Sequence, residues 1–318
     1  MKKISVVTPC YNEEGNVELL HKAVVDIFTR LGNYRLEHIF IDNASVDGTA
    51  DKIKEMAKTD KSVKLIVNTR NFGHIRSPMH AFFQARGDAV ILMAADFQDP
   101  PELLEDFIRK WENGYKIIIG VKKNSEEFRA MWLLRRAYYR FVKRISDIDL
   151  IQDFTGFGLY DREVVEHLRS FKEPYPYFRG QIAELGHETK KIPFSQPVRK
   201  RGITKNNFYT LYDIAMLGIT TSSKVPLRLA TMAGFILSII SLLIAFFYII
   251  IKLLFWNAFS VGMAPLIFGV YFLGSVQLFF IGILGEYIGA IHTNVRNRPY
   301  VIEKERINFD DNDSTELS

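Results

Sequence analysis

The chain has 318 residues, of which 48% are hydrophobic and 24% are charged, and its formal net charge is +5. This length suits one α/β domain followed by a smaller region, and the charge is too mild to indicate a nucleic-acid partner. The single cysteine, Cys10, excludes an internal disulfide and a cysteine-based zinc site.

Residues 1–121 alternate between strand-like and helix-like hydrophobic patterns. Strands separated by helices predict a doubly wound, mostly parallel α/β sheet with helices on both faces. Ligands of such a sheet bind beyond the carboxyl ends of its strands, so the polar segments 9–14, 42–49 and 94–99 hold candidate site residues. The expected strands are Ile4–Thr8, Glu37–Asp42, Val63–Val67, Ala89–Met93 and Lys116–Val121, and the expected helices lie near 17–28, 49–56, 76–86 and 101–113.

Residues 122–146 are rich in Lys and Arg, with aromatic side chains between them. A basic amphipathic helix of this kind commonly lies at a membrane interface, and the plainer alternative is a surface helix that packs its aromatic residues into the core. The membrane-like segments further along the chain favour the interfacial interpretation. A second amphipathic helix is expected at 206–226, just before the first of those segments.

Residues 229–251 and 253–285 contain no Asp, Glu, Lys or Arg and are rich in large apolar side chains. About 20 apolar residues are enough to cross the hydrocarbon core as a helix. We therefore expect two transmembrane helices at about 227–251 and 263–289, within a membrane region of 227–291. The alternative is a pair of helices buried in a large soluble core.

Basic residues flank the predicted spans on their outer sides, and these are Lys224, Arg228, Arg296 and Arg298. The positive-inside rule then predicts a hairpin in the cytoplasmic membrane with both termini in the cytoplasm. The first residues do not resemble a signal peptide, because their apolar run ends at Pro9. The tail, 292–318, is expected to be disordered. Its one strand-like run, Tyr300–Ile302, could pair with a sheet edge, that of a neighbouring subunit included.

Carboxylates at the expected strand ends are candidates for substrate and metal binding. Asp42 could accept hydrogen bonds from a nucleobase or a ribose. Asp96 and Gln98 are two residues apart, so on an extended segment their side chains face the same way. Such a pair suits Mg²⁺ or Mn²⁺, which takes further ligands from water and substrate phosphates. Each residue alone could be a turn residue or a helix N-cap, and their joint placement favours a site.

Four segments together resemble the signature of glycosyltransferase family 2. They are Val6–Glu14, Ile41–Thr49, Asn71–Gly73 and Ala95–Glu102. With the apolar hairpin, residues 1–300 are similar to the polyisoprenyl-phosphate glycosyltransferases of that family, which include bactoprenol glucosyltransferases and dolichyl-phosphate mannose synthases. The resemblance implies a GT-A domain over 1–205 and transfer of a hexose to undecaprenyl phosphate with inversion. UDP-glucose is the preferred donor, and GDP-mannose, UDP-N-acetylglucosamine and UDP-aminoarabinose remain alternatives.

The resemblance also implies roles for individual residues. The nucleotide sugar is expected to contact Pro9, Tyr11, Glu13, Asp42, Arg70, Asp96, Gln98, Arg201 and Lys205. The acceptor phosphate is expected to contact Arg129, Arg135, Arg136 and Arg140, within the basic segment. Asp96 and Asp153 are the catalytic candidates, and Asp96 and Gln98 are the metal ligands. Asp153, and after it Asp99, could orient the acceptor or take a proton, although Asp153 could instead pair with an arginine. The expected partners are a UDP-sugar, a polyprenyl phosphate lipid, the membrane and further copies of the chain, a tetramer included.

Three departures from the family pattern stand out. Ala94 replaces the first carboxylate of the usual Asp-x-Asp, Asn43 stands where a second aspartate is common, and Thr155–Gly158 lacks the arginine of a Ser-Gly-Phe-Arg segment. The first two motivate a catalytically weak membrane scaffold as the non-enzyme alternative. A processive polysaccharide synthase fits less well because a Gln-x-x-Arg-Trp motif is missing, and a channel fits poorly because the spans contain no filter sequence.

Overall fold

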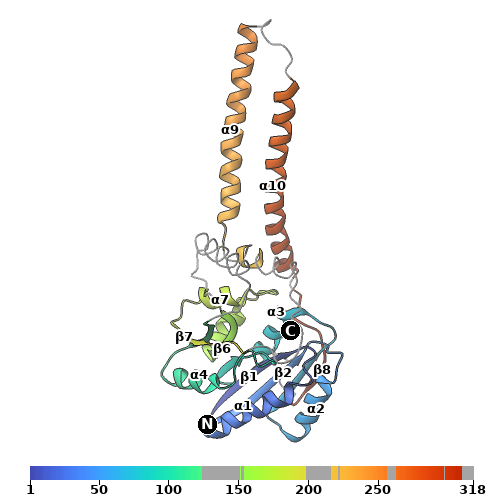
Figure 1. Cartoon of the computed structure of the whole chain (residues 1–318), viewed down its shortest axis with the longest axis vertical. Coiled ribbons are helices and arrows are strands. Elements are labelled where there is room, and N and C mark those ends of the chain that lie inside the picture. The colour runs from blue at the N-terminus through green and yellow to red at the C-terminus, as the bar shows by residue number, and fades with distance from the viewer. Residues whose placement is uncertain are drawn as a thin grey trace.

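The computed structural model describes residues 1–123, 151, 154–197, 216–220, 223–255, 263–296 and 298–309. A head built around one sheet lies at one end of two long helices, and the C-terminal segment runs back along the head (Figure 1). We call the described residues up to 197 the head and the two long helices the hairpin. The basic segment 122–146 lies almost wholly outside the described residues, as do Asp153, Arg201 and Lys205.

Eight strands form the sheet at the centre of the head. They are β1 (Lys2–Cys10), β2 (Tyr34–Asp42), β3 (Val63–Asn68), β4 (Ala89–Leu92), β5 (Ile117–Lys122), β6 (Phe154–Asp161), β7 (Thr189–Phe194) and β8 (Glu303–Ile307). Their order is β7-β5-β6-β4-β1-β2-β3-β8. Strands β6 and β8 run antiparallel to their neighbours, and the other described pairs are parallel. This mixed, mostly parallel sheet confirms the expected fold class.

Helices cover both faces of the sheet, and each face has its own hydrophobic core. The helices of the head are α1 (Val17–Leu31), α2 (Thr49–Thr59), α3 (Gly73–Gln84), α4 (Leu103–Glu112), α6 (Arg162–Ser170) and α7 (Phe178–Glu184). The first core joins α1, α2 and α4 to one face around Phe40, Phe107 and Phe157. The second joins α3, α6 and α7 to the other face around Phe82 and Tyr160. The apolar residues of α1 recur every three or four positions, which is why one side of this helix is buried.

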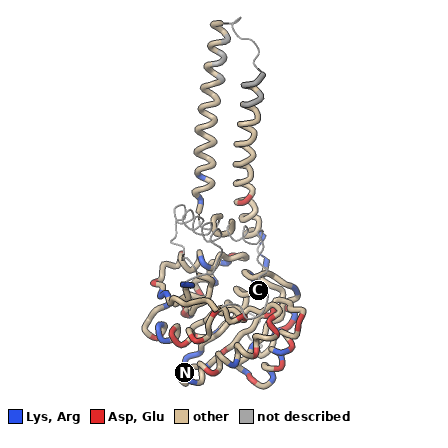
Figure 2. The backbone as a smooth tube through the Cα atoms, in the orientation of Figure 1, with Lys and Arg blue, Asp and Glu red and all other residues tan. Residues whose placement is uncertain are grey.

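The hairpin consists of α9 (Val225–Leu254) and α10 (Met263–Val295), both longer than the expected spans. Segments Val225–Ile244 and Gly269–Val295 have mean hydropathies of 2.1 and 1.5, and their most apolar windows are only 6% and 0% buried. The alternative of two buried core helices is therefore not what the structure shows. The Lys, Arg and Glu residues that Figure 2 colours on the two helices lie near the head. Length and composition suit membrane-spanning helices.

Residues 298–309, which we call the strap, correct the prediction of a disordered tail. The strand in this region is Glu303–Ile307 rather than 300–302, and it pairs antiparallel with β3 of the same chain. Ile302 O accepts a hydrogen bond from Thr69 N at 2.9 Å. Asn308 Nδ2 donates to the carbonyls of Ala57 and Val63 at 2.7 and 2.8 Å. Without the strap, β3 would be an edge strand with unpaired backbone groups.

Candidate active site

Three loops follow the carboxyl ends of β1, β2 and β4, which are neighbours in the sheet. Each contains a residue other than glycine in the left-handed region: Asn12 with φ 60°, Ala44 with φ 60° and Phe97 with φ 59°. Such conformations cost free energy and persist where the surrounding structure enforces them, most often at functional sites. Three of the five such residues in the described part of the chain thus lie at the edge of the sheet where the sequence predicts ligand binding.

The loops after β1 and β2 are fastened to each other by reciprocal hydrogen bonds. Asn12 N donates to Ser45 Oγ at 2.9 Å, and Val46 N donates back to Asn12 Oδ1 at 2.9 Å. Glu13 N donates to Thr49 Oγ1 at 2.8 Å, at the start of α2. These bonds explain why the motif residues around 12–14 and 45–49 occur together: each loop satisfies the backbone groups of the other.

Asp42 ends β2 and is almost completely buried, with 1% of its surface exposed. Its Oδ2 accepts a hydrogen bond from Ser45 N at 3.0 Å, whereas its Oδ1 is buried without a hydrogen-bond partner among the described residues. Burial raises the pKa of this carboxyl, the hydrogen bonds with Ser45 oppose that rise, and Asp47 adds to it. A buried acceptor without a donor is costly unless a ligand supplies one.

Asn43 has a role that the sequence analysis missed. Its Nδ2 donates to Asn71 Oδ1 at 3.0 Å and to Gly73 O at 3.2 Å, and its Oδ1 accepts from Asn68 Nδ2 at 3.0 Å and from Phe72 N at 2.9 Å. An aspartate cannot donate, so it could not make the first two bonds. The departure from the family pattern at position 43 thus fastens the Asn71–Gly73 segment to the end of β2.

The loop after β4 holds two buried carboxylates. Asp96 and Asp99 are 6% and 7% exposed. Asp96 Oδ1 accepts from Gln98 N at 3.2 Å, and Asp99 Oδ2 accepts from Ala94 N at 2.9 Å. Burial raises the pKa of Asp99 to about 6; the Ala94 amide opposes the rise, Asp96 reinforces it and Lys122 opposes it. Two crowded carboxylates beside each other fit a bound cation electrostatically.

The reasoning that placed Asp96 and Gln98 on one face does not apply to this loop. Phe97 between them is left-handed, so the segment is not extended and the side chains do not alternate as in a strand. The two residues are instead neighbours in a turn closed by the Gln98 amide. Their assignment as metal ligands stays a prediction.

A family model described as glycosyl transferase family 2 matches residues 5–169 of this chain, including all three loops. The chain belongs to glycosyl transferase family 2. Glycosyltransferase CsbB of Bacillus subtilis is 36% identical over 306 residues, which are 95% of this chain and 91% of the relative. A bactoprenol glucosyl transferase derived from prophage SfII of Shigella flexneri is 35% identical over 304 residues, covering 95% and 98%.

Among solved structures, a glucosyl-3-phosphoglycerate synthase from Mycobacterium tuberculosis, in complex with Mn²⁺, UDP and phosphoglyceric acid, matches with a TM-score of 0.47. Its sequence is 18% identical, and the match covers 69% of this chain and 77% of the synthase.

The other expected nucleotide residues that the structure describes lie around the same edge. Pro9, Tyr11 and Glu13 follow one another at the end of β1 with half-buried side chains. Glu13 Oε2 accepts from Asn16 Nδ2 at 2.6 Å, so this carboxylate also fixes the start of α1. Arg70 is exposed, and its guanidinium lies 4.0 Å from the centre of the Phe72 ring. The remaining expected residues, Arg201, Lys205, Asp153 and the four arginines of 122–146, lie outside the described residues.

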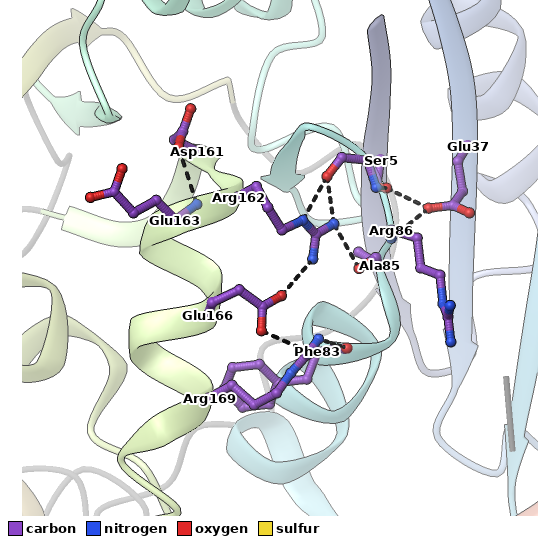
Figure 3. Close-up of polar contacts among 11 residues, drawn as sticks. Ser5, Glu37, Phe83, Ala85, Arg86, Asp161, Arg162, Glu163, Glu166 and Arg169 are labelled. Carbon is purple, nitrogen blue, oxygen red and sulfur yellow. Dashed lines mark hydrogen bonds and ion pairs between the residues drawn. The ribbon is translucent and has the colours of Figure 1, made fainter. Parts of the chain in front are cut away.

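The opposite end of the same strands carries buried charges that serve the fold. Glu37 Oε1 lies 2.7 Å from Lys3 Nζ and 3.0 Å from Lys64 Nζ, and its Oε2 contacts Ser5 Oγ and, at 3.0 Å, Arg86 N. Close by, Arg162 bonds to the carbonyls of Ala85 and Gly87 (Figure 3). These groups pair with one another and lie away from the carboxyl ends of the strands, so we assign them to the fold rather than to the candidate site.

Proposed function

We propose that this enzyme transfers a glucosyl group from UDP-glucose to undecaprenyl phosphate, with inversion at the anomeric carbon. The observation that carries the proposal is the combination, in one chain, of strained loops holding buried carboxylates and an exposed apolar hairpin. The relative from Shigella flexneri, named a bactoprenol glucosyl transferase, aligns with both parts, since the alignment covers 95% of this chain.

The nucleotide half of the donor is assigned to the edge around Asp42. Uracil and ribose both present hydrogen-bond donors. Asp42 Oδ1, a buried acceptor without a partner among the described residues, could accept a hydrogen bond from either. Pro9, Tyr11 and Glu13 would complete this side, with Arg70 near its exposed rim. Arg201 and Lys205 are proposed to contact the diphosphate.

Asp96 and Gln98 are proposed to hold Mg²⁺ or Mn²⁺ between the loop after β4 and the donor diphosphate. A bound ion would neutralise the charge that develops on the leaving diphosphate. Asp99 supports the loop by accepting the bond from Ala94 N, and Lys122, at the end of β5, is near enough to Asp99 to lower its pKa. Ala94 in place of a carboxylate leaves Asp96 as the ion's principal negatively charged ligand.

The acceptor phosphate needs orientation more than activation. A phosphate monoester has a second pKa of about 6, so it is mostly ionised at neutral pH and is already a nucleophile. Arg129, Arg135, Arg136 and Arg140 are proposed to hold it behind the anomeric carbon, and Asp153 to orient it or accept a residual proton. Oriented approach of this kind can lower a barrier by roughly 7–11 kcal/mol.

A transfer panel tests the proposal with the full chain in detergent. Undecaprenyl phosphate is incubated with radiolabelled UDP-glucose, GDP-mannose, UDP-N-acetylglucosamine or UDP-aminoarabinose, with Mg²⁺, with Mn²⁺ or with chelator. We expect lipid-linked label from UDP-glucose above the others, and loss of it with chelator. Label from another donor would change the sugar, and no label from any donor would favour the scaffold alternative.

We further propose that the hairpin spans the cytoplasmic membrane with both termini in the cytoplasm and that the enzyme forms homo-oligomers, with a tetramer as the working model. Protease protection of an N-terminal and a C-terminal epitope in inverted vesicles and in spheroplasts tests the topology. The mass of the detergent-solubilised complex tests the oligomer, and a monomeric mass would refute it.

A further inference from the structure

A second group of metal-ligating side chains lies near the amino ends of β4, β5 and β7, at the end of the strands opposite the loops described above. Among the described residues, Glu163, His167 and His187 each offer one ligand atom, and these three atoms lie within 4.8 Å of one another. Glu163 and His167 belong to α6, and His187 precedes β7, the strand at the edge of the sheet. None of them belongs to a motif that supports the transferase reaction.

The local structure explains why these side chains converge. Glu163 and His167 are four residues apart on one helix, so they lie one above the other on the same face. Figure 3 shows the Glu163 side chain leaving α6 on the side away from Arg162 and Glu166. Gly186, with φ +67°, turns the chain after α7, and its neighbour His187 then stacks on His167 with 6.1 Å between ring centres and 17° between ring planes.

We propose that Glu163, His167 and His187 form a binding site for Zn²⁺ or a similar transition-metal ion, with water as the fourth ligand. Two imidazoles and one carboxylate are a ligand set that zinc takes in proteins, whereas Mg²⁺ prefers oxygen ligands alone. Metal–ligand bonds of about 2.1 Å place tetrahedral ligands roughly 3.4 Å apart. The three atoms must therefore approach one another by up to about 1.4 Å, which the exposed ends of Glu163 and His167 allow by small rotations.

Lys116 is a positively charged group beside the proposed site, and a bound cation must displace it from Glu163. Its Nζ lies 2.7 Å from Glu163 Oε2 and 3.3 Å from Asp161 Oδ1. The Lys116 ammonium therefore competes with a metal ion for the Glu163 carboxylate. When an ion takes Glu163, Lys116 retains Asp161 as its partner. Bound metal would thus join α6 to the segment that leads into β7.

The test uses the full chain in detergent with the affinity tag removed, treated with chelator and then kept in excess Mg²⁺ so that oxygen sites are occupied. Co²⁺ is titrated while its visible absorption is recorded, and Zn²⁺ is then added in competition. We expect one Co²⁺ per chain with a band typical of nitrogen and oxygen ligands, displaced by Zn²⁺. Thermal unfolding should shift upward when Zn²⁺ is present.

Four variants sharpen the result. H167A and H187A should each weaken Zn²⁺ binding at least about tenfold and abolish the thermal shift. H292A, which removes an exposed histidine at the end of α10, is the matched control and should bind as the parent does. Lys116→Met should bind more tightly, because it removes the competing charge. Absent saturable Co²⁺ binding, or equal binding by H187A and H292A, would overturn the proposal, whatever the transferase activity.

Discussion

Replacement of Asp42 by asparagine should separate donor binding from stability. Asn keeps the shape of the side chain, and its one oxygen can still accept the bond from Ser45 N that Asp42 Oδ2 accepts at 3.0 Å. Its amide nitrogen then occupies the position of the buried Oδ1, where a donor of the nucleotide is proposed to bind. The variant therefore puts a donor opposite a donor at a buried atom that has no hydrogen-bond partner among the described residues.

The expected magnitude follows from the loss of a charged hydrogen bond. Such bonds contribute about 1.5–3 kcal/mol, which corresponds to a rise in the KM for UDP-glucose of about 10- to 140-fold. The KM for undecaprenyl phosphate should stay within twofold. Since burial raises the pKa of Asp42, the ionised side chain is disfavoured in the folded protein, and the neutral amide should leave the melting temperature unchanged or higher.

Initial rates of lipid-linked glucose formation, measured at varied UDP-glucose and saturating lipid, give these constants. Asp51→Asn is the matched control, because Asp51 is an exposed aspartate in the first turn of α2, close to the same loop in sequence. A KM for the donor equal to that of Asp51→Asn would refute the role of Asp42. A large loss of melting temperature would show that the residue is structural instead.

Four further predictions concern the fold around the site. Asn43→Asp should lower the free energy of unfolding by about 1–3 kcal/mol, since two donated bonds are lost, and denaturant titration measures this. Glu37→Gln should lower the free energy of unfolding by up to about 3 kcal/mol near pH 7. Burial by itself would raise the pKa of Glu37, but interactions with Lys3, Ser5, the Arg86 amide and Lys64 together lower it to about 2. That deficit should be full above pH 4.5 and fade as pH falls toward 2, which melting curves across pH report. Gly158→Ala should lower the free energy of unfolding by about 1–3 kcal/mol, because the added Cβ would lie 2.5 Å from Ile118 O. Thermal unfolding of the variant measures this loss. Deletion of 298–318 should lower the melting temperature by several degrees through loss of β8 and of buried Val301.

Specific outcomes would contradict three of these predictions. An unchanged free energy of unfolding for Asn43→Asp would mean that the Asn43 side chain does not fasten the Asn71–Gly73 segment to the end of β2. A pH-independent deficit for Glu37→Gln would contradict the charge-based explanation. Deletion of 310–318 alone leaves β8 intact and is the control for the longer truncation, so equal melting of the two shortened chains would show that the strap adds no stability.

The alternation of hydrophobic residues was sufficient to predict the first part of the head. Strands at 34–42 and 63–68 and the helix at 17–31 lie where the pattern indicated, because each buries an apolar face. Strand β8 was not predicted, because its sequence, Glu303–Ile307, is mostly charged and lacks the hydrophobic alternation of a strand. Its polar side chains find partners on the head: Glu303 pairs with His80 at 2.5 Å and Glu305 with Lys54 at 2.6 Å. Long-range pairing of this kind leaves no periodic signal.

The candidate site was partly predictable for a related reason. Strand ends are readable from sequence, so Asp42 and Asp96 were identified as candidates. The hydrogen bonds of Asn43 to Asn68 and Asn71 join residues more than twenty positions apart, so the local sequence does not predict them. The missing arginine at position 158 also has a physical account: a Cβ at Gly158 would lie 2.5 Å from Ile118 O and 3.1 Å from Ile119 Cα, so this backbone accepts no side chain there.

The strap orders events during synthesis. The ribosome produces β1 to β7 first, then both apolar helices, and only afterwards the strand that closes the sheet beside β3. Until α10 has emerged, that flank of the nascent polypeptide exposes unpaired amides and carbonyls. Completion of the head is thereby coupled to synthesis of the hairpin, and a chain stalled before residue 303 would expose an unpaired β3 edge to chaperones and proteases.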